Sequence, residues 1–295
     1  MSKPLMMIIN PAAGKCKFRE GLAEALKLLS DAGYTTSIFF TERRGHAAEL
    51  AAEHASDFER VLVLGGDGTL GEAVAGLMRL ESRPQIGYIP IGTANDIART
   101  FGFVKGDIVE GTRRFITGKS FAFDTGHYQG GYFNYVAAFG SLADVSYGTP
   151  QNLKNQFGQA AYLTAAGKAL LKLKPIWARV EYDGGVMEGE FIHGGVNNSF
   201  SLGGVVDMPP NTVELDDGLF ELALIRQTPG LTSLAGLAAR VLTHHYDSEY
   251  LTIVKTARAK FTFAEPQILS LDGEMSSPMT ELDFEICPKA VEIIC

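Results

Sequence analysis

The sequence predicts two domains: an α/β domain with a three-layer architecture around a parallel sheet, and after it a mainly antiparallel β domain. The chain has 295 residues, a length that suits two modest domains better than one. Over the first 120 residues, short apolar runs alternate with amphipathic segments, as in a parallel sheet covered by helices. Beyond about residue 120, aromatic segments broken by Gly, Asp and Asn replace this alternation, which favours antiparallel strands.

The first domain is predicted element by element from the spacing of its apolar residues. Short, nearly continuous apolar runs are typical of buried strands, and apolar residues three or four positions apart are typical of helices. Leu22, Leu26 and Leu29 follow the helical spacing, and Gly33 marks the end of that helix. The predicted strands are 5–9, 35–40, 61–64 and 86–89. The predicted helices are 18–32, 45–55, 69–80 and 94–101.

Turn signals organise the second domain. Gly130-Gly131 and Asp183-Gly184-Gly185 each separate two strand-like segments, as hairpin turns do. Two helices are predicted among the strands, at about 153–173 and 231–243. The change of pattern places the first domain at 1–122 and the second at 123–285.

Composition and charge argue against several classes of function. Hydrophobic residues make up 46% of the chain and charged residues 20%, so a sizeable core needs no covalent staple. The formal net charge of −8 argues against nucleic-acid binding, because an acidic chain repels phosphates. Cys16, Cys287 and Cys295 fit neither a zinc site nor a disulfide framework, which indicates a reducing cytoplasm. No apolar run approaches the roughly 20 residues of a membrane span, so we expect a soluble protein.

The strongest local signal is a buried strand that runs into Gly65-Gly66-Asp67-Gly68-Thr69, directly before a helix. Glycine lets a phosphate approach the backbone N–H groups, and a helix N-terminus adds positive potential. Asp67 would repel a phosphate unless Mg²⁺ lies between them. An ordinary strand–helix turn rarely needs three glycines, an Asp and a Thr together. The pattern therefore favours a site for nucleotide phosphates.

Two other phosphate-binding motifs do not fit. Gly66, Gly68 and Gly71 match the spacing of the dinucleotide-binding fingerprint. The next predicted strand, however, ends in Ile89-Pro90-Ile91-Gly92, without the acidic residue that binds the ribose. A Walker A loop is absent, because the Gly-Lys-Ser at Gly118-Lys119-Ser120 has Arg113 where the pattern requires its first glycine.

Two further loops follow predicted strands of the same domain. Asn10-Pro11-Ala12-Ala13-Gly14-Lys15 follows the first strand, and Pro90-Ile91-Gly92-Thr93-Ala94-Asn95-Asp96 follows the fourth. The carboxyl ends of parallel strands meet at one edge of a sheet, where ligands bind. Each loop alone could be a capped start of a helix. Together, the three loops predict one nucleotide site.

These loops resemble those of the diacylglycerol kinase catalytic-domain family, in its bacterial soluble lipid-kinase form. The family elements Asn-Pro-x-x-Gly, Gly-Gly-Asp-Gly-Thr and Pro-x-Gly-Thr-x-Asn-Asp all stand here in order. A fourth element runs from Asn197-Asn198-Ser199 through Pro209 to Asp216-Asp217-Gly218, and a fifth is Leu271-Asp272-Gly273-Glu274. The similarity covers residues 8 to about 275. The Gly-Gly-Asp-Gly-Thr element alone is shared with NAD kinases, whereas the full set in this order is far more specific.

The resemblance implies an ATP-dependent lipid kinase with an ATP-binding α/β domain and a β-sandwich lipid-substrate domain. It implies that a final strand, at about 286–295, returns to the first domain. Glu274 is implied as the general base that accepts a proton from a hydroxyl of a lipid such as diacylglycerol or a related glycerolipid. The residues implied to contact ATP are Asn10, Thr41, Gly66, Asp67, Gly68, Thr69, Leu70, Gly71, Glu72, Thr93 and Asn95.

Two magnesium sites are also expected. The resemblance implies a structural Mg²⁺ held by Glu214, Asp217 and Leu219, mainly through backbone carbonyl groups. A catalytic Mg²⁺ is expected beside Asp67 and Asp96.

One departure and two alternatives bear on this interpretation. The family commonly has Asn where this chain has Gly71, so a side-chain hydrogen bond in the nucleotide loop is expected to be missing. The alternatives are a small-molecule kinase, of the NAD or sphingoid-base type, and a catalytically weak lipid-binding regulatory protein.

The expected partner is a lipid at a membrane surface, met by a cytoplasmic protein in transient peripheral contact. Basic residues between 151 and 180 either face solvent or form a patch for phospholipid headgroups. The sequence leaves the oligomeric state open, with a homodimer among the alternatives.

Overall fold

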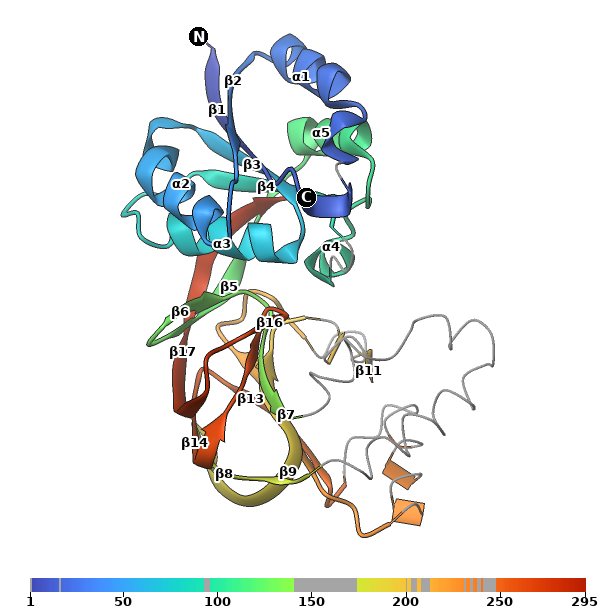
Figure 1. Cartoon of the computed structure of the whole chain (residues 1–295), viewed down its shortest axis with the longest axis vertical. Coiled ribbons are helices and arrows are strands. Elements are labelled where there is room, and N and C mark those ends of the chain that lie inside the picture. The colour runs from blue at the N-terminus through green and yellow to red at the C-terminus, as the bar shows by residue number, and fades with distance from the viewer. Residues whose placement is uncertain are drawn as a thin grey trace. The chain divides into compact units, whose positions relative to one another are not determined.

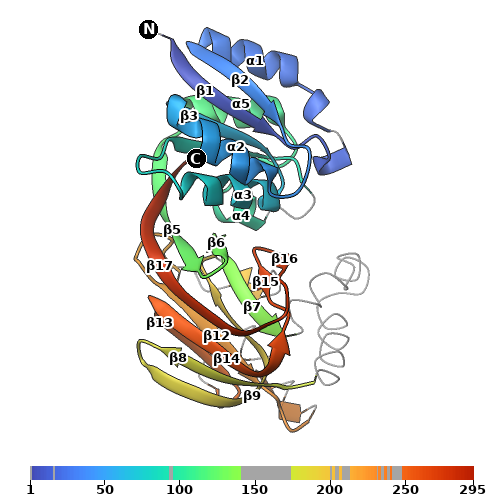
Figure 2. The same ribbon diagram turned by 60° about the vertical axis from the view of Figure 1, so that its left-hand side comes forward.

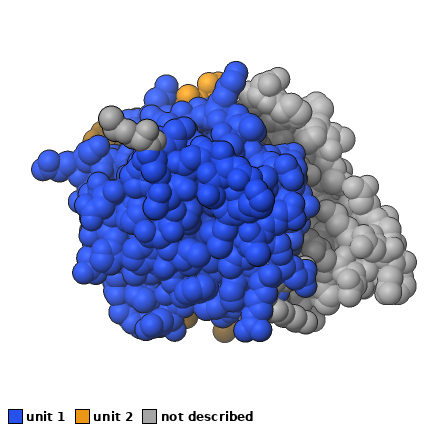
Figure 3. Space-filling model, turned by 90° about the horizontal axis from the view of Figure 1, so that it is seen from above, with its two compact units in different colours: residues 1–125, 131–134, 287–295 blue, residues 126–130, 135–286 orange. Residues whose placement is uncertain are grey.

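The computed structural model divides the chain into two compact units (Figures 1 and 3). Unit 1 contains Met1–Thr125, Gly131–Asn134 and Cys287–Cys295. Unit 2 contains Gly126–Gly130 and Tyr135–Ile286. The residues that the structure describes are 2–15, 17–92, 96–140, 174–199, 201–202, 206–207, 213–230, 232–233, 236–237, 240 and 248–295.

Unit 1 is built on a parallel sheet, as predicted, in the order β4-β3-β1-β2 (Figure 2). These strands are β1 (Lys3–Ile9), β2 (Tyr34–Phe40), β3 (Arg60–Gly65) and β4 (Gln85–Pro90). Leu5 to Ile9 of β1 and Val61 to Leu64 of β3 are fully buried. Burial on both faces is what continuous apolar runs require, and it explains why these strands could be recognised.

Five α-helices are described in unit 1: α1 (Leu22–Asp31), α2 (His46–His54), α3 (Asp67–Leu77), α4 (Asp96–Thr100) and α5 (Ile108–Thr117). Helices α1 and α5 pack on one face of the sheet, where Leu29 and Phe115 join the core with Met7 and Leu62. Helices α2 and α3 contact each other on the other face (Figure 1). This gives the predicted three layers, and the predicted fold class is confirmed.

Two helix predictions were wrong in detail. The predicted helix 18–32 is interrupted, because Gly21 has a left-handed φ of 80° and separates the 3₁₀ turn η2 (Lys17–Arg19) from α1. The short 3₁₀ turns η1 (Ala13–Lys15) and η3 (Ala55–Asp57) were not predicted either.

The second error concerns α5, which was missed altogether. Its N-terminus carries a capping pattern, since the Asp107 side chain accepts a hydrogen bond from the Glu110 N–H at 2.9 Å.

Unit 2 consists mainly of antiparallel strands, in the order β16-β15-β7-β9-β8-β14-β17, with β12 pairing both β9 and β13. In the aromatic core, the Phe139 ring makes edge-on contacts with the rings of Phe261, at 5.6 Å between centroids, and Phe263, at 4.9 Å. Its longer strands are β7 (Val136–Gly140), β8 (Ile176–Tyr182), β9 (Gly185–Asn197), β12 (Phe220–Arg226), β13 (Leu251–Thr256) and β14 (Arg258–Gln267). Its two-residue strands are β10 (Ser201–Leu202), β11 (Val206–Asp207), β15 (Ser270–Leu271) and β16 (Glu274–Met275).

Both predicted hairpins are present. Strand β5 (Ser120–Tyr128) pairs with β6 (Gly131–Phe133) across Gly130, and β8 pairs with β9 from Tyr182↔Gly185 onward. Gly185 has a φ of 140°, a conformation that residues with side chains rarely adopt.

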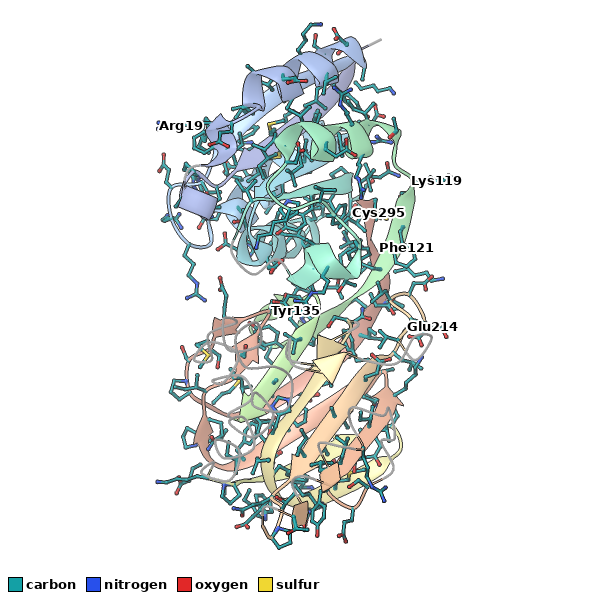
Figure 4. All side chains as sticks on the ribbon, turned by 90° about the vertical axis from the view of Figure 1, so that its right-hand side faces the viewer. Arg19, Lys119, Phe121, Tyr135, Glu214 and Cys295 are labelled. Atoms are coloured by element: carbon teal, nitrogen blue, oxygen red, sulfur yellow. The ribbon has the colours of Figure 1, made fainter. Side chains whose placement is uncertain are left out.

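The final strand, β17 (Met279–Ile294), contributes to both units. In unit 2 it pairs with β14, and in unit 1 Ile293 and Ile294 pair in parallel with Ile86 and Gly87 of β4. Cys295 exchanges two backbone hydrogen bonds with Lys119, both of 3.1 Å, and the two residues lie side by side in Figure 4. The C-terminus is therefore part of the unit 1 sheet.

Some predicted features lie outside the described residues. These are the helix 153–173, most of the helix 231–243, and the site residues Thr93 and Asn95. For Asp96 the structure describes the backbone, at the start of α4, and not the side chain.

Candidate functional site

The Gly65–Thr69 loop connects the end of β3 to the start of α3. Gly66 has ordinary extended dihedrals, φ −97° and ψ −178°, so no left-handed turn requires a glycine there, and a Cβ atom would lie 3.5 Å from the Gly92 Cα atom. At Gly65, in contrast, lack of space requires a glycine. A Cβ atom at Gly65 would lie 2.5 Å from the Thr69 Cβ atom. Helix α3 starts at Asp67, two residues earlier than predicted, which puts the N–H groups of Asp67, Gly68 and Thr69 at its N-terminus. Such a helix end binds anions.

Asp67 is held at this helix end by a residue that the sequence did not point to. The Asp67 side chain is only 8% exposed. The Tyr88 hydroxyl, from the neighbouring strand β4, lies 3.3 Å from Asp67 Oδ1 and 3.5 Å from the Gly65 carbonyl oxygen. A tyrosine inside an otherwise apolar strand was the only available signal, because a buried phenol needs a polar partner.

Asn10 connects the first loop to the second. Its side-chain nitrogen donates to the Thr69 hydroxyl at 2.9 Å, and its side-chain oxygen accepts from the Ala12 N–H at 3.0 Å. Its backbone N–H donates to the Leu64 carbonyl. The structure therefore brings Asn10 and Thr69 together at the carboxyl edge of the sheet, and the Asn10 side chain fixes loop geometry.

The loop after β2 joins the same edge. Thr41 is 8% exposed, and its N–H donates to the Ile9 carbonyl at 2.9 Å. The Glu72 carboxylate accepts hydrogen bonds from the N–H groups of Gly45, at 2.7 Å, and Ala47, at 3.2 Å. Of the remaining predicted residues, Gly68 and Gly71 are partly exposed on α3, whereas the Leu70 side chain is buried. Any contact of Leu70 with a ligand must use its backbone.

In unit 2, Glu274 follows a tight turn. Asp272 and Gly273 both have positive φ, 49° and 81°, as in the turn type that Asp-Gly favours between antiparallel strands. Asp272 Oδ1 accepts hydrogen bonds from the N–H groups of Tyr135, at 2.9 Å, and Val136, at 3.1 Å. Glu274 pairs with Leu271 across the turn and stays partly exposed. Burial, followed by the negative charges of Asp272 and Glu274, raises the pKa of the Tyr128 hydroxyl.

The acidic turn before β12 contains Glu214, Asp217 and Leu219. Glu214 is exposed and is labelled in Figure 4. Asp217 Oδ1 accepts from the Leu219 N–H at 2.9 Å, and Asp217 Oδ2 forms an ion pair of 2.6 Å with Lys255 Nζ. Among the described residues, no three acidic, His or Cys side chains converge on one point. A metal ion at this turn therefore needs backbone carbonyl ligands.

The surroundings of Glu221 show whether a cation would fit near this turn. It lies on β12, opposite Lys255 on β13, and is only 2% exposed. Neither of its carboxylate oxygens has a hydrogen-bond partner on another residue of the described part of the chain. Burial raises its pKa to about 8, with smaller contributions from Asp217 and Glu214 in the same direction, while Lys255 acts in the opposite one. With a pKa of about 8, Glu221 is mainly protonated at neutral pH, and a divalent cation close to the turn would favour its charged form.

Two family models match the chain. The model described as diacylglycerol kinase catalytic domain matches residues 4–128, and the model described as YegS C-terminal NAD kinase beta sandwich-like domain matches residues 137–295. Together they span both units.

Several relatives are similar over most of the chain. A diacylglycerol kinase of Bacillus subtilis (strain 168) is 35% identical over 274 residues, covering 92% of this chain and 90% of the relative. One from Staphylococcus aureus (strain MRSA252) is 35% identical over 278 residues, covering 93% and 87%. A crystal structure of a diacylglycerol kinase from Bacillus anthracis str. Sterne superposes with a TM-score of 0.78 at 26% identity, covering 99% of this chain and 96% of that one.

Proposed function

The chain belongs to the diacylglycerol kinase family, and from this membership we propose that it transfers the γ-phosphoryl group of ATP to a hydroxyl group of a lipid such as diacylglycerol or a related glycerolipid. One observation carries the proposal. A buried carboxylate, Asp67, occupies the first position of a helix whose N-terminus follows a glycine pair at the carboxyl edge of a parallel sheet. That combination suits a phosphate chain with its metal ion, and an uncharged ligand would need neither feature.

In this proposal, the loops after β1, β2, β3 and β4 form the ATP site. The N–H groups of Gly66 to Thr69 receive the phosphates, and Asn10 keeps the first loop against Thr69. Thr41, in the loop after β2, and Glu72, on α3, border the site, and Thr93 and Asn95 follow β4 in the sequence. Asp67 and Asp96 are proposed to hold a Mg²⁺ ion, which would neutralise charge on the transferred phosphoryl group when bound.

Glu274 is proposed as the general base. Its carboxylate takes the proton of the acceptor hydroxyl as that oxygen attacks the γ-phosphorus atom. The new bond joins the lipid oxygen to phosphorus, the bond between the β–γ bridging oxygen and phosphorus breaks, and ADP leaves with the electron pair. The Asp272-Gly273 turn supports this role, because two backbone hydrogen bonds to Asp272 fix the base of the turn.

The acidic turn is proposed to hold a structural Mg²⁺ through Glu214, Asp217 and Leu219. The unpartnered carboxylate of Glu221 supports the proposal, because a cation nearby would lower the cost of burying its charge. When bound, the ion would tie the turn to the start of β12.

The two units are proposed to divide the task. Residues 1–122 and the end of β17 would bind ATP, and 123–285 would bind the lipid. No helix in the described ranges is both long and apolar enough to cross a bilayer. The lipid is therefore proposed to be met by transient contact of the protein with a membrane surface in the cytoplasm.

The acceptor can be identified with one assay. The protein is incubated with ATP labelled in the γ-phosphoryl group, Mg²⁺ and either a total lipid extract, a sphingoid base or NAD. Label in a glycerolipid product after thin-layer separation supports the proposal. Label in NADP or in a phosphorylated sphingoid base assigns a different kinase, and no transfer to any acceptor contradicts kinase function.

A further inference from the structure

The half-buried side chain of Glu72 is hydrogen-bonded to a second helix, α2. Its carboxylate oxygens accept the N–H groups of Gly45 and Ala47, which lie at and just inside the N-terminus of α2. Gly45 has no side chain with which to cap the helix. An acidic group at this end is favoured, because the first N–H groups of a helix lack partners within it and carry partial positive charge. Glu72 supplies the missing cap from outside the helix.

One face of α3 is directed at the neighbouring loops. Thr69, Glu72 and Gly76 are three and four residues apart, so they share a side of the helix. The Thr69 hydroxyl accepts from Asn10, and a Cβ atom at Gly76 would lie 2.3 Å from the Ala48 carbonyl oxygen of α2. Glu72 lies between these two contacts along the helix. It is therefore on the side of α3 that packs against α2 and the loop carrying Asn10.

The short segment between Thr41 and Gly45 is fixed at both ends. Thr41 is anchored to β1 through the Ile9 carbonyl, and Glu42 donates its N–H to His46 Nδ1 at 3.0 Å. Arg43 forms a two-bond ion pair with Glu49, with distances of 2.9 Å and 2.5 Å. All of these contacts except that of Thr41 are made with residues of α2. The position of residues 42–44 therefore depends on the position of the α2 N-terminus.

We propose that Glu72 is a positioning residue for the nucleotide site and not a nucleotide ligand. By capping α2 from α3, it connects the Gly66–Thr69 loop to the segment that carries Thr41, so that both sides of the site keep their spacing. An ionised carboxylate only accepts hydrogen bonds and would repel the phosphates, so a structural role of Glu72 toward α2 is favoured over direct contact with them. This inference rests on the proposed ATP-binding function.

A double-mutant cycle on nucleotide affinity separates the two roles. The four proteins are the wild type, Glu72→Ala, Thr41→Val and the double variant, with Glu72→Gln as the milder replacement. The MgATP dissociation constant is measured by calorimetry, and Glu53→Gln, an exposed change on α2, serves as the matched control. Glu72→Ala is expected to weaken MgATP binding by about tenfold, because a charge-assisted pair of hydrogen bonds is lost.

The cycle gives the decisive result. If Glu72 acts through the segment carrying Thr41, Glu72→Ala raises the MgATP dissociation constant by less than about twofold in the Thr41→Val background. Glu72→Gln, which keeps one acceptor oxygen, should fall between the wild type and Glu72→Ala, with kcat at saturating ATP little changed. An equal loss of MgATP affinity on Glu72→Ala in the wild-type and Thr41→Val backgrounds would overturn the positioning role. A lowered melting temperature of Glu72→Gln with unchanged MgATP affinity would overturn it as well. A wild-type protein that binds no MgATP would instead contradict the proposed function itself.

Discussion

At the scale of single residues, the proposed chemistry depends most on Glu274. Positioned acid–base catalysis contributes roughly 10²–10⁴-fold to a rate. Glu274→Gln keeps the size of the side chain and cannot accept the proton. We expect kcat for the lipid acceptor to fall by about that factor, with MgATP affinity little changed.

The matched control for this prediction is Glu265→Gln, which changes an exposed residue of β14 in the same unit. It should keep the wild-type rate. A Glu274→Gln protein that phosphorylates its lipid within a few-fold of the wild type would move the general base elsewhere, with Asp96 the next candidate.

His193 predicts a pH dependence of stability. It lies on β9, is 5% exposed, and its Nδ1 atom has no hydrogen-bond partner. Burial lowers its pKa to about 4, while a hydrogen bond with the backbone of Phe139 acts in the opposite direction. The unfolded chain, with a His pKa near 6.5, binds the proton first. The contribution of His193 to the free energy of unfolding is therefore fully present above about pH 6.5 and is lost as the pH falls toward 4.

Thermal melts at several pH values test this prediction. The stability of the wild type should fall by up to about 1.4 kcal/mol per pH unit from this single group across that window. His193→Gln should lose that part of the slope, whatever its own stability, while His54→Gln should keep it. An unchanged slope in His193→Gln would mean that other groups cause the acid sensitivity.

The sequence predicted which polar residues gather at the nucleotide edge but not what each of them contacts. Asn10, Asp67 and Thr69 could be selected because glycine-rich loops after strands have a physical reason. Tyr88 could not, because its role depends on which strand lies beside β3. Glu72 stood next to the motif and was assigned to ATP by resemblance, although its hydrogen bonds lead to α2.

At the scale of elements, continuous apolar runs and hairpin-turn signals were reliable guides. The buried strands β1, β3 and β4 follow continuous apolar runs, whereas β2 is mostly exposed or half-buried. The parallel pairing of the four strands follows from the helices between them. Helix α5 was missed because its mean composition is polar, although Asp107 and Glu110 form a recognisable start signal. The break at Gly21 depends on a left-handed backbone angle, which every glycine can adopt but few glycines have to adopt. The break could therefore not be predicted from the sequence.

The turn before β12 yields a prediction about metal binding. A Mg²⁺ ion held there only in the folded state stabilises the protein, by about 2.7 kcal/mol at a hundredfold excess over its dissociation constant. We expect the melting temperature to rise with MgCl₂ and to fall with EDTA. Asp217→Asn should reduce this response, and Asp283→Asn, an exposed change on β17, should leave it intact.

This measurement does not depend on enzymatic activity. Identical melting temperatures of the wild type in EDTA and in excess Mg²⁺ would contradict a structural ion. Lys255 would then be the cation that balances Asp217.

At the scale of the whole molecule, the alternation of elements specified the parallel sheet of unit 1, and the turn signals specified the antiparallel character of unit 2. The order of the strands in unit 2 could not be predicted, because β12 pairs with β9 and β13 through contacts distant in sequence. The return of the C-terminus to β4 was implied by resemblance only, since a strand of this length carries no local signal of its partner.

The most direct test of the central claim is the transfer of phosphate from ATP to diacylglycerol in mixed micelles, measured for the wild type and for Asp67→Asn. The wild type should convert diacylglycerol to its phosphorylated product in a reaction that requires Mg²⁺. Asp67→Asn should lose at least about a hundredfold in rate, because it removes the charge proposed to hold the ion, while keeping its circular dichroism spectrum. No phosphorylated glycerolipid from the wild type, or near-normal turnover by Asp67→Asn, would contradict the account.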